Sequence, residues 1–215
     1  MRRIILTLVM LAAGLCTAMA GDNETLRARK VLDMTANKLK SMKGLSVHFT
    51  IAQYSGKKQQ GNSTGRIDIQ DTRFHVTMPD MLSWFDGKSQ WSMVPGDTEV
   101  NLTAPTPEEQ QAMNPYAFLS LYKSGYTFQI DHTKLADGTQ GWKILMKAQS
   151  ATQKISRMQV EIDRNYIPVR VTMQQGKSQL VRIDVDKLEG NRTFPADHFT
   201  FPRKQYPNVE IIDLR

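Results

Sequence analysis

The sequence predicts a mainly β fold in which a curled antiparallel sheet of about ten strands is combined with helices. From Leu45 onward, apolar and polar residues alternate with a period of two, which is typical of half-buried strands. Turn-forming pairs such as Asp86-Gly87 and Asp137-Gly138 separate these runs. One segment with helical periodicity precedes the strands, and one short apolar segment interrupts them. Many short strands at regular spacing indicate a meander that curls into a barrel or half-barrel.

The first twenty residues have the layout of a cleaved secretory signal. A short basic start precedes the apolar stretch from Ile4 to Leu15, and Ala18-Met19-Ala20 offers a small-x-small cleavage site. The apolar stretch is shorter than the roughly 20 residues that a membrane-spanning helix needs. We therefore expect cleavage after Ala20, secretion across a membrane, and a single domain formed by residues 21–215.

Cys16 is the only cysteine, and it falls within this expected signal. Its neighbours are in the wrong order for a lipidation site, so we expect residues 21–215 to carry no disulfide and no cysteine metal ligand. Loss of Arg2 and Arg3 leaves 26 basic and 21 acidic residues, a net charge of +5. This mild charge is spread along the chain, which favours solubility, with attraction to anionic surfaces as the alternative. It does not indicate nucleic-acid binding, because no basic helix or aromatic-studded basic strand occurs.

A helix is expected from Glu24 to Met42. Its apolar residues recur at helical spacing, and they are Ala28, Leu32, Ala36, Leu39 and Met42. Basic residues occupy the other side of the helix. The pair Lys43-Gly44 ends it, because glycine readily adopts the left-handed conformation that closes a helix.

Ten strands follow this helix in the prediction. Each carries two to four apolar residues at alternate positions, and the ranges are 45–52, 66–70, 73–78, 88–94, 99–102, 126–130, 142–146, 155–163, 169–173 and 180–188. No internal repeat, charge block or low-complexity linker divides them, which supports the assignment to one domain.

One apolar helical segment interrupts the strands. Thr106-Pro107-Glu108-Glu109 reads as a capping box with proline at the first helical position. Asn114-Pro115 repeats the arrangement of a capping residue followed by proline, and Gly125 ends the segment. The residues between are unusually apolar for a connection between strands. We therefore expect this segment to cover something apolar, such as the open mouth of the curled sheet.

The sequence offers little support for an enzyme or a metal site. The four histidines show no metal-ligand spacing, and no nucleophile elbow occurs. Gly87-Lys88-Ser89 and Gly176-Lys177-Ser178 resemble the end of a phosphate-binding loop but lack its upstream glycine, so they read as hairpin turns. Asp184 and Asp186 alternate with apolar residues, as exposed strand carboxylates do. We expect a protein that is not an enzyme and that needs no cofactor or metal.

Large, pliable apolar side chains are abundant. Nine methionines and all three tryptophans lie beyond residue 20. Methionine fills irregular space and adapts to variable apolar ligands, so these residues are compatible with an apolar cavity as well as with ordinary core packing.

The chain resembles the periplasmic lipoprotein carrier family LolA, in the form typical of Bacteroidetes. The resemblance is carried by several segments in a shared order. These are Leu45-Ser46-Val47-His48-Phe49-Thr50, Gly65, Phe74 after a basic residue, the turn and aromatic strand Phe85 to Met93, the helix start Asn114-Pro115-Tyr116-Ala117-Phe118-Leu119, and the end Phe199-Thr200-Phe201-Pro202 with Val209 to Arg215.

The resemblance implies an incomplete, half-open antiparallel β-barrel of about 10–11 strands, with an N-terminal helix and short helices covering its cavity. The cavity would shelter lipoprotein acyl chains, and we expect its lining to include Val47, Phe49, Ile67, Ile69, Phe74, Val76, Trp84, Trp91 and Met93. A lid is expected at Phe118, Leu119, Leu121 and Tyr122. The family carries an Arg-Pro pair whose arginine helps to latch the lid. Asp71-Thr72 stands there in this chain, so Arg73 is the candidate latch.

This interpretation predicts a monomeric carrier that moves acylated lipoproteins from an inner-membrane ABC-type lipoprotein-releasing complex to an outer-membrane acceptor, either a protein or the membrane itself. Two alternatives stay open. One is a periplasmic lipid or glycolipid transfer protein with the same cavity. The other is a lipoprotein-sensing binding module that acts on a protein partner.

Overall fold

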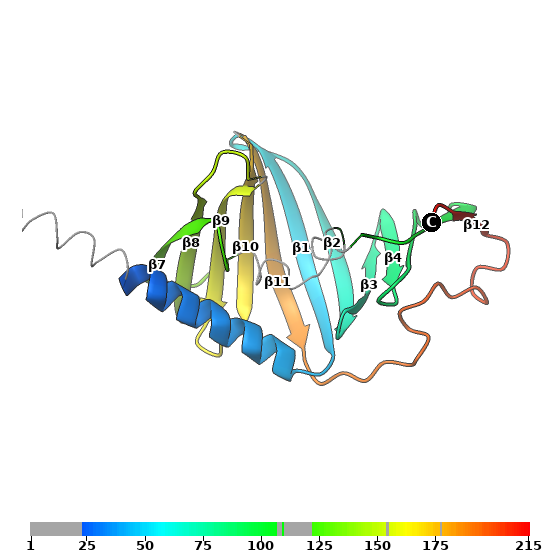
Figure 1. Cartoon of the computed structure of the whole chain (residues 1–215), viewed down its shortest axis with the longest axis horizontal. Helices are drawn as coiled ribbons and strands as arrows, with labels where there is room; N and C mark the ends of the chain where they lie inside the picture. The colour runs from blue at the N-terminus through cyan, green and yellow to red at the C-terminus, as the bar shows by residue number, and fades with distance from the viewer. Residues whose placement is uncertain (1–22, 107–108, 110–121, 154, 177) are drawn as a thin grey trace, which may run out of the picture.

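The computed structural model describes residues 23–106, 109, 122–153, 155–176 and 178–215. The described chain is mostly β, with one long helix at residues 23–41 and one large open sheet (Figure 1). Within that part of the chain, no helix is long and apolar enough to cross a membrane. The segment of residues 1–20, expected to be a signal, lies outside the described residues.

Twelve strands form the sheet. Their bounds are β1 Leu45–Ser55, β2 Lys58–Gln70, β3 Arg73–Met78, β4 Met81–Phe85, β5 Gln90–Met93, β6 Glu99–Thr103, β7 Tyr126–Lys134, β8 Gln140–Ala148, β9 Ile155–Asp163, β10 Pro168–Gln175, β11 Gln179–Glu189 and β12 Glu210–Asp213. Their order across the sheet is β12-β6-β5-β4-β3-β2-β1-β11-β10-β9-β8-β7. Neighbouring strands in the sheet are consecutive in the chain except at β1–β11 and β6–β12, so the meander of β1 to β6 meets the meander of β7 to β11 where β1 pairs with β11.

The sheet has two strands more than the ten expected, β4 and β12. In β4 the adjacent residues Trp84 and Phe85 are both buried, on opposite faces, so its alternation of apolar and polar residues is lost. The short β12 pairs in parallel with β6 at the edge, whereas the other recorded pairs are antiparallel. A partner so distant in the chain leaves no local pattern in the sequence.

The hairpin of β1 and β2 extends beyond the predicted strands. Its far end is polar and exposed, and the turn at Gly56 has a φ of 61°. Polar residues on both faces give no alternation, which is why the prediction for the second strand began only at Arg66.

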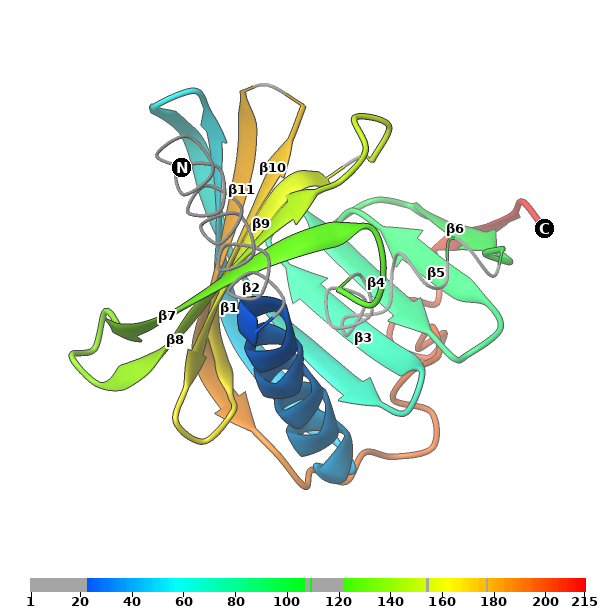
Figure 2. The same cartoon turned by 60° about the vertical axis from the view of Figure 1, so that its left-hand side comes forward.

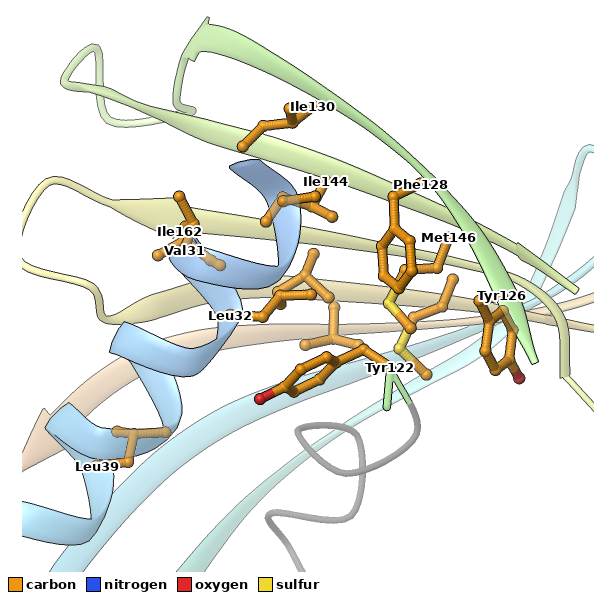
Figure 3. Close-up of a cluster of buried hydrophobic side chains, with 14 of the residues drawn as sticks. Val31, Leu32, Leu39, Tyr122, Tyr126, Phe128, Ile130, Ile144, Met146 and Ile162 are labelled. Atoms are coloured by element: carbon orange, nitrogen blue, oxygen red, sulfur yellow. The ribbon is translucent and has the colours of Figure 1, made fainter. Parts of the chain in front are cut away.

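The N-terminal helix packs across one face of the sheet, which we call the helix face (Figures 1 and 2). The predicted apolar stripe is buried, with Ala28 and Leu32 fully enclosed and Leu39 only 3% exposed. These residues join a core with apolar side chains of β7 to β10, as Figure 3 shows for Leu32, Phe128 and Ile144. The helix is therefore held by burial of this stripe rather than by its own hydrogen bonds alone.

The opposite face of the sheet, the outer face, carries a second core. Side chains of residues paired across neighbouring strands point to the same face. Phe74 pairs with Ile69 and with Phe85, and these three belong to the helix-face core. His75 pairs with Trp84, which pairs with Trp91, so these side chains lie on the outer face.

The C-terminal segment, residues 194–209, covers the outer face of β3 to β6 (Figure 2). Phe201 packs edge-on against Trp84 with 5.5 Å between ring centroids, and it stacks on Tyr206. Met93, Val100 and Val209 complete this second core. The apolar side of the sheet thus differs between its two halves. In β1, β2 and β8–β11 it is the helix face, and in β4–β6 it is the outer face.

The start of the expected helical insertion has the predicted capping box. The backbone N–H of Thr106 donates to Oε2 of Glu109 at 2.8 Å, and the N–H of Glu109 donates to Oγ1 of Thr106 at 3.2 Å. These two reciprocal bonds define a helix start. Most of the residues that follow lie outside the described part of the chain.

Candidate functional site

An apolar cavity of about 260 Å³ lies on the helix face, between the C-terminal half of the helix and the central strands. The helix, the strands β1 and β2, and the strands β10 and β11 all contribute to its lining. The lining residues are Leu39, Leu45, Val47, Phe49, Ile51, Ile67, Ile69, Pro168, Val171, Met173, Ile183, Val185 and Leu188. All are apolar, so the cavity offers neither a charge nor a side-chain hydrogen bond. This chemistry suits a hydrocarbon ligand.

Sheet register explains how residues far apart in the chain meet here. Val47 of β1 pairs with Ile67 of β2 on one side and with Leu188 of β11 on the other. A bulge between His48 and Phe49 shifts the register with β11 by one residue, so that Phe49 pairs with Val185. Alternate residues of three neighbouring strands therefore face the same space.

Four of the nine predicted lining residues line this cavity, and they are Val47, Phe49, Ile67 and Ile69. Phe74 and Val76 lie on the same face in the adjoining core. Trp84, Trp91 and Met93 lie on the outer face in the second core, and the structure does not bring them to the cavity.

The other nine cavity residues were not singled out from the sequence. Except for Pro168, those of β10 and β11 lie within the predicted strands 169–173 and 180–188, and their alternation marks one apolar face. Alternation does not reveal which strands are neighbours, and the pairing of β11 with β1 spans most of the chain. That pairing is what places Ile183 and Val185 beside Phe49.

Of the four predicted lid residues, Phe118, Leu119 and Leu121 lie outside the described residues. Tyr122 is described and is only 3% exposed. Its hydroxyl donates to Oδ1 of Asp33 on the helix at 2.5 Å, and Figure 3 shows the ring reaching toward the helix between Leu32 and Leu39. Burial and the hydrogen bond to Asp33 raise the pKa of Tyr122 above its ordinary value. This predicted lid residue is therefore anchored to the helix.

Arg73, the candidate latch, contacts the C-terminal segment. Its guanidinium carbon lies 5.0 Å from the ring centroid of Phe199, a cation–π geometry. Phe199 is 1% exposed, so the arginine contacts a buried residue of the C-terminal segment that covers the second core. A role of Arg73 in latching the lid stays a prediction.

A polar group that the sequence spacing does not reveal lies at the edge of the C-terminal segment. Potential ligand atoms of Asp68, His75 and His198 lie within 4.8 Å of one another. Asp68 accepts two hydrogen bonds from Arg66, both at 2.9 Å, and its Oδ2 lies 2.8 Å from Nε2 of His198. His75 stacks on Trp84 with ring centroids 5.1 Å apart. Since the carboxylate already pairs with a guanidinium, the arrangement serves to attach the segment to the sheet.

The comparisons with known proteins agree with this architecture. The family model described as outer membrane lipoprotein carrier protein LolA matches residues 18–177. The chain belongs to this LolA family. No curated protein sequence matches the chain.

The chain is similar to solved structures from several bacteria. The Mycobacterium tuberculosis lipoprotein LppX has a TM-score of 0.51 and 14% identity, over 80% of this chain and 98% of LppX. A putative outer membrane lipoprotein-sorting protein domain from Vibrio parahaemolyticus has a TM-score of 0.46 and 8% identity, over 82% of this chain and 97% of that domain. A LolA superfamily protein from Nitrosomonas europaea has a TM-score of 0.44 and 10% identity, over 81% of this chain and 97% of its own. At 14% identity, the similarity to LppX shows a shared fold.

Proposed function

We propose that this LolA family member is a periplasmic carrier that holds the acyl chains of lipoproteins in the helix-face cavity. The wholly apolar lining of that cavity carries the proposal. Each methylene moved from water into such a lining gains about 0.8 kcal/mol. An acyl chain of roughly 16 carbons then gains on the order of 12 kcal/mol before the costs of binding.

A carrier must also release its cargo. The cavity volume of about 260 Å³ lies just below the range of roughly 300–1,000 Å³ that is common for small-molecule sites. We expect it to admit one acyl chain or part of one in this state, and to widen for a lipoprotein with several chains. The predicted lid at Phe118, Leu119, Leu121 and Tyr122 would compete for the same space, with Tyr122 as its fixed end. That competition would keep the net affinity low enough for transfer.

The remaining parts of the proposal follow from a carrier role between two membranes. Residues 1–20 would act as a signal that is cleaved after Ala20. An ABC-type lipoprotein-releasing complex of the inner membrane would load the carrier, and an outer-membrane acceptor would unload it. The carrier is not an enzyme and acts as a monomer, so one cargo occupies one molecule.

The test uses a photo-crosslinking amino acid at two positions in the native host. Position 49 lies in the cavity, and position 91 lies on the outer face as the matched control. We expect acylated lipoproteins, identified by mass spectrometry, to be captured at position 49 and not at 91. Capture of free lipids or glycolipids at position 49 would favour a lipid-transfer protein, and capture of one unacylated protein a sensing module. No capture at position 49 would contradict the proposal.

A further inference from the structure

Beyond the cavity, the helix face changes from apolar to polar across β4 to β6. The register places Gln90 beside Phe85 and beside Thr103, and Ser92 beside Ser83 and beside Asn101. Phe85 belongs to the helix-face core, so its neighbours across the strands point to the same face. We call Ser83, Gln90, Ser92, Asn101 and Thr103 the polar strip.

The polar strip lies on the same face of the sheet as the cavity, with Phe74 and Phe85 between them. Ile69 lines the cavity in β2, and Phe74, Phe85 and Gln90 follow it across β3, β4 and β5. Strands lie about 4.8 Å apart, so Gln90 lies about 14 Å from Ile69 along the sheet. A ligand with its hydrocarbon end in the cavity has its polar end within reach of the strip.

Hydrogen-bonding capacity remains on the strip. Nε2 of Gln90 donates to Oγ of Ser83 at 3.0 Å and to Oγ of Ser92 at 3.2 Å, and the two hydroxyls lie 3.1 Å apart. The hydrogen bond between the hydroxyls of Ser83 and Ser92 uses the hydrogen of one of them and leaves the hydrogen of the other. Among the described residues, the second hydroxyl hydrogen and Oε1 of Gln90 have no hydrogen-bond partner, and Ser92, Gln90 and Asn101 are partly or fully exposed.

The charges around the strip favour neutral head groups of a ligand over anionic ones. None of its five members is charged, and two carboxylates stand at its far end, since Glu99 of β6 pairs with Glu210 of β12. In the part of the chain that the structure describes, a phosphate or carboxylate head would meet no cation among the strip residues and would face these two acids. Ester and amide carbonyls and hydroxyls need only the donors and acceptors that the strip supplies.

We infer that the polar strip binds the uncharged head of the cargo, namely the glyceryl ester and amide linkages of an acylated lipopeptide. This inference rests on the proposed function, because it assumes that acyl chains occupy the cavity. It goes further in choosing among lipids that share the same chains. The strip selects the neutral ester and amide linkages of a lipoprotein over the anionic head of a phospholipid.

The test compares three probes on the purified protein. The uncharged dye N-phenyl-1-naphthylamine reports on the cavity alone. A synthetic S-(dipalmitoylglyceryl)-cysteine lipopeptide with an acetylated N-terminus and an amidated C-terminus is uncharged, and it competes with the dye, as does dipalmitoyl phosphatidylglycerol, which has the same chains. We expect the lipopeptide to bind wild-type protein at least about tenfold more tightly than the phospholipid, as the gain or loss of one or two hydrogen bonds permits.

Substitutions then locate the selectivity. Gln90→Glu, and independently Ser83→Ala with Ser92→Ala, should weaken lipopeptide binding about tenfold while dye binding changes less than twofold. Gln129→Glu makes the same chemical change at an exposed position of β7 and should alter neither. Equal affinity for both lipids, unchanged by the strip variants, would overturn the inference and leave the carrier role standing. Failure of the dye and both lipids to bind wild-type protein would overturn both.

Discussion

Nε2 of His198 lies 2.8 Å from Oδ2 of Asp68, a contact that joins residues 130 positions apart. Asp68 is 3% exposed and also holds the guanidinium of Arg66 through both carboxylate oxygens. His198 in turn stacks on Phe194, with ring centroids 4.7 Å apart. One buried carboxylate in β2 thus attaches the C-terminal segment to the outer face, where that segment covers the second core.

Asp68→Asn should destabilise the fold. An amide cannot accept the two charge-assisted bonds of Arg66, whose side chain is partly exposed, so the loss costs about 2 kcal/mol. For a chain of this size, the melting temperature should fall by roughly 4–8 °C. Circular dichroism melting of the two proteins measures the effect. Asp131→Asn, at an exposed position of β7, is the control and should melt like the wild type. A melting temperature for Asp68→Asn equal to that of the control would contradict this account.

Acid should weaken the same region, first through His75. Burial, assisted by the nearby His198, lowers the pKa of His75 to about 4. The pKa of an unfolded histidine is about 6.5, so the folded state disfavours protonation. The stability is therefore complete above about pH 6.5 and is lost as the pH falls toward 4, by roughly 3 kcal/mol at most.

The pKa of Asp68 adds a second, more acidic step. Burial would raise this pKa, but hydrogen bonds, including those with Arg66 and His198, outweigh burial and lower it. Its contribution is lost only as the pH falls through that lowered value. Denaturant unfolding at pH 7.5 and pH 4.5 measures the first step. His75→Gln should reduce the difference between the two pH values, whereas His48→Gln, at an exposed position of β1, should preserve it. An equal pH dependence in His75→Gln and wild type would exclude His75 as its source.

Local patterns were enough to predict much of the fold. The helix stripe at Ala28, Leu32 and Leu39 and the capping box at Thr106 depend on neighbours in the chain, and both were found as predicted. Strand alternation located ten of the twelve strands. β4 escaped because Trp84 and Phe85 pack into different cores, and β12 because its pairing partner β6 is remote.

The site was harder to predict because alternation groups residues by face without saying what each face meets. Trp84, Trp91 and Met93 have the apolar pattern expected of a cavity wall. The apolar side of the sheet changes between β3 and β4, and the segment that covers the outer face lies about a hundred residues later in the chain. The cluster of Asp68, His75 and His198 depends on the same long-range contact.

The two cores should respond to substitution in opposite ways. Trp84→Ala removes a ring that is 3% exposed and packs on Phe201, at a cost of about 3–5 kcal/mol. Because Trp84 faces away from the cavity, the folded fraction should bind N-phenyl-1-naphthylamine with unchanged affinity. Val185→Phe instead fills part of the cavity and should weaken dye binding with little loss of stability. Unfolding curves and dye titrations of both variants are the measurement. Loss of dye binding in folded Trp84→Ala would show that the outer face also contributes to the binding site.

Gly65 limits the position of the Phe49 ring in the cavity wall. The two residues pair across β1 and β2, and a Cβ at position 65 would lie 2.5 Å from Cζ of Phe49 and 2.9 Å from Cγ of Met78. Gly65→Ala must therefore push the ring into the cavity, at a cost of about 1–3 kcal/mol, and should weaken dye binding. Gly61→Ala is a matched control in the same strand, since a Cβ there meets nothing within 4 Å. It should be neutral or stabilise the fold by about 0.5 kcal/mol, because alanine restricts the unfolded chain more than glycine does. Melting curves and dye titrations compare the two. If they behave alike, the Phe49 ring has room to move aside and does not define the shape of the cavity.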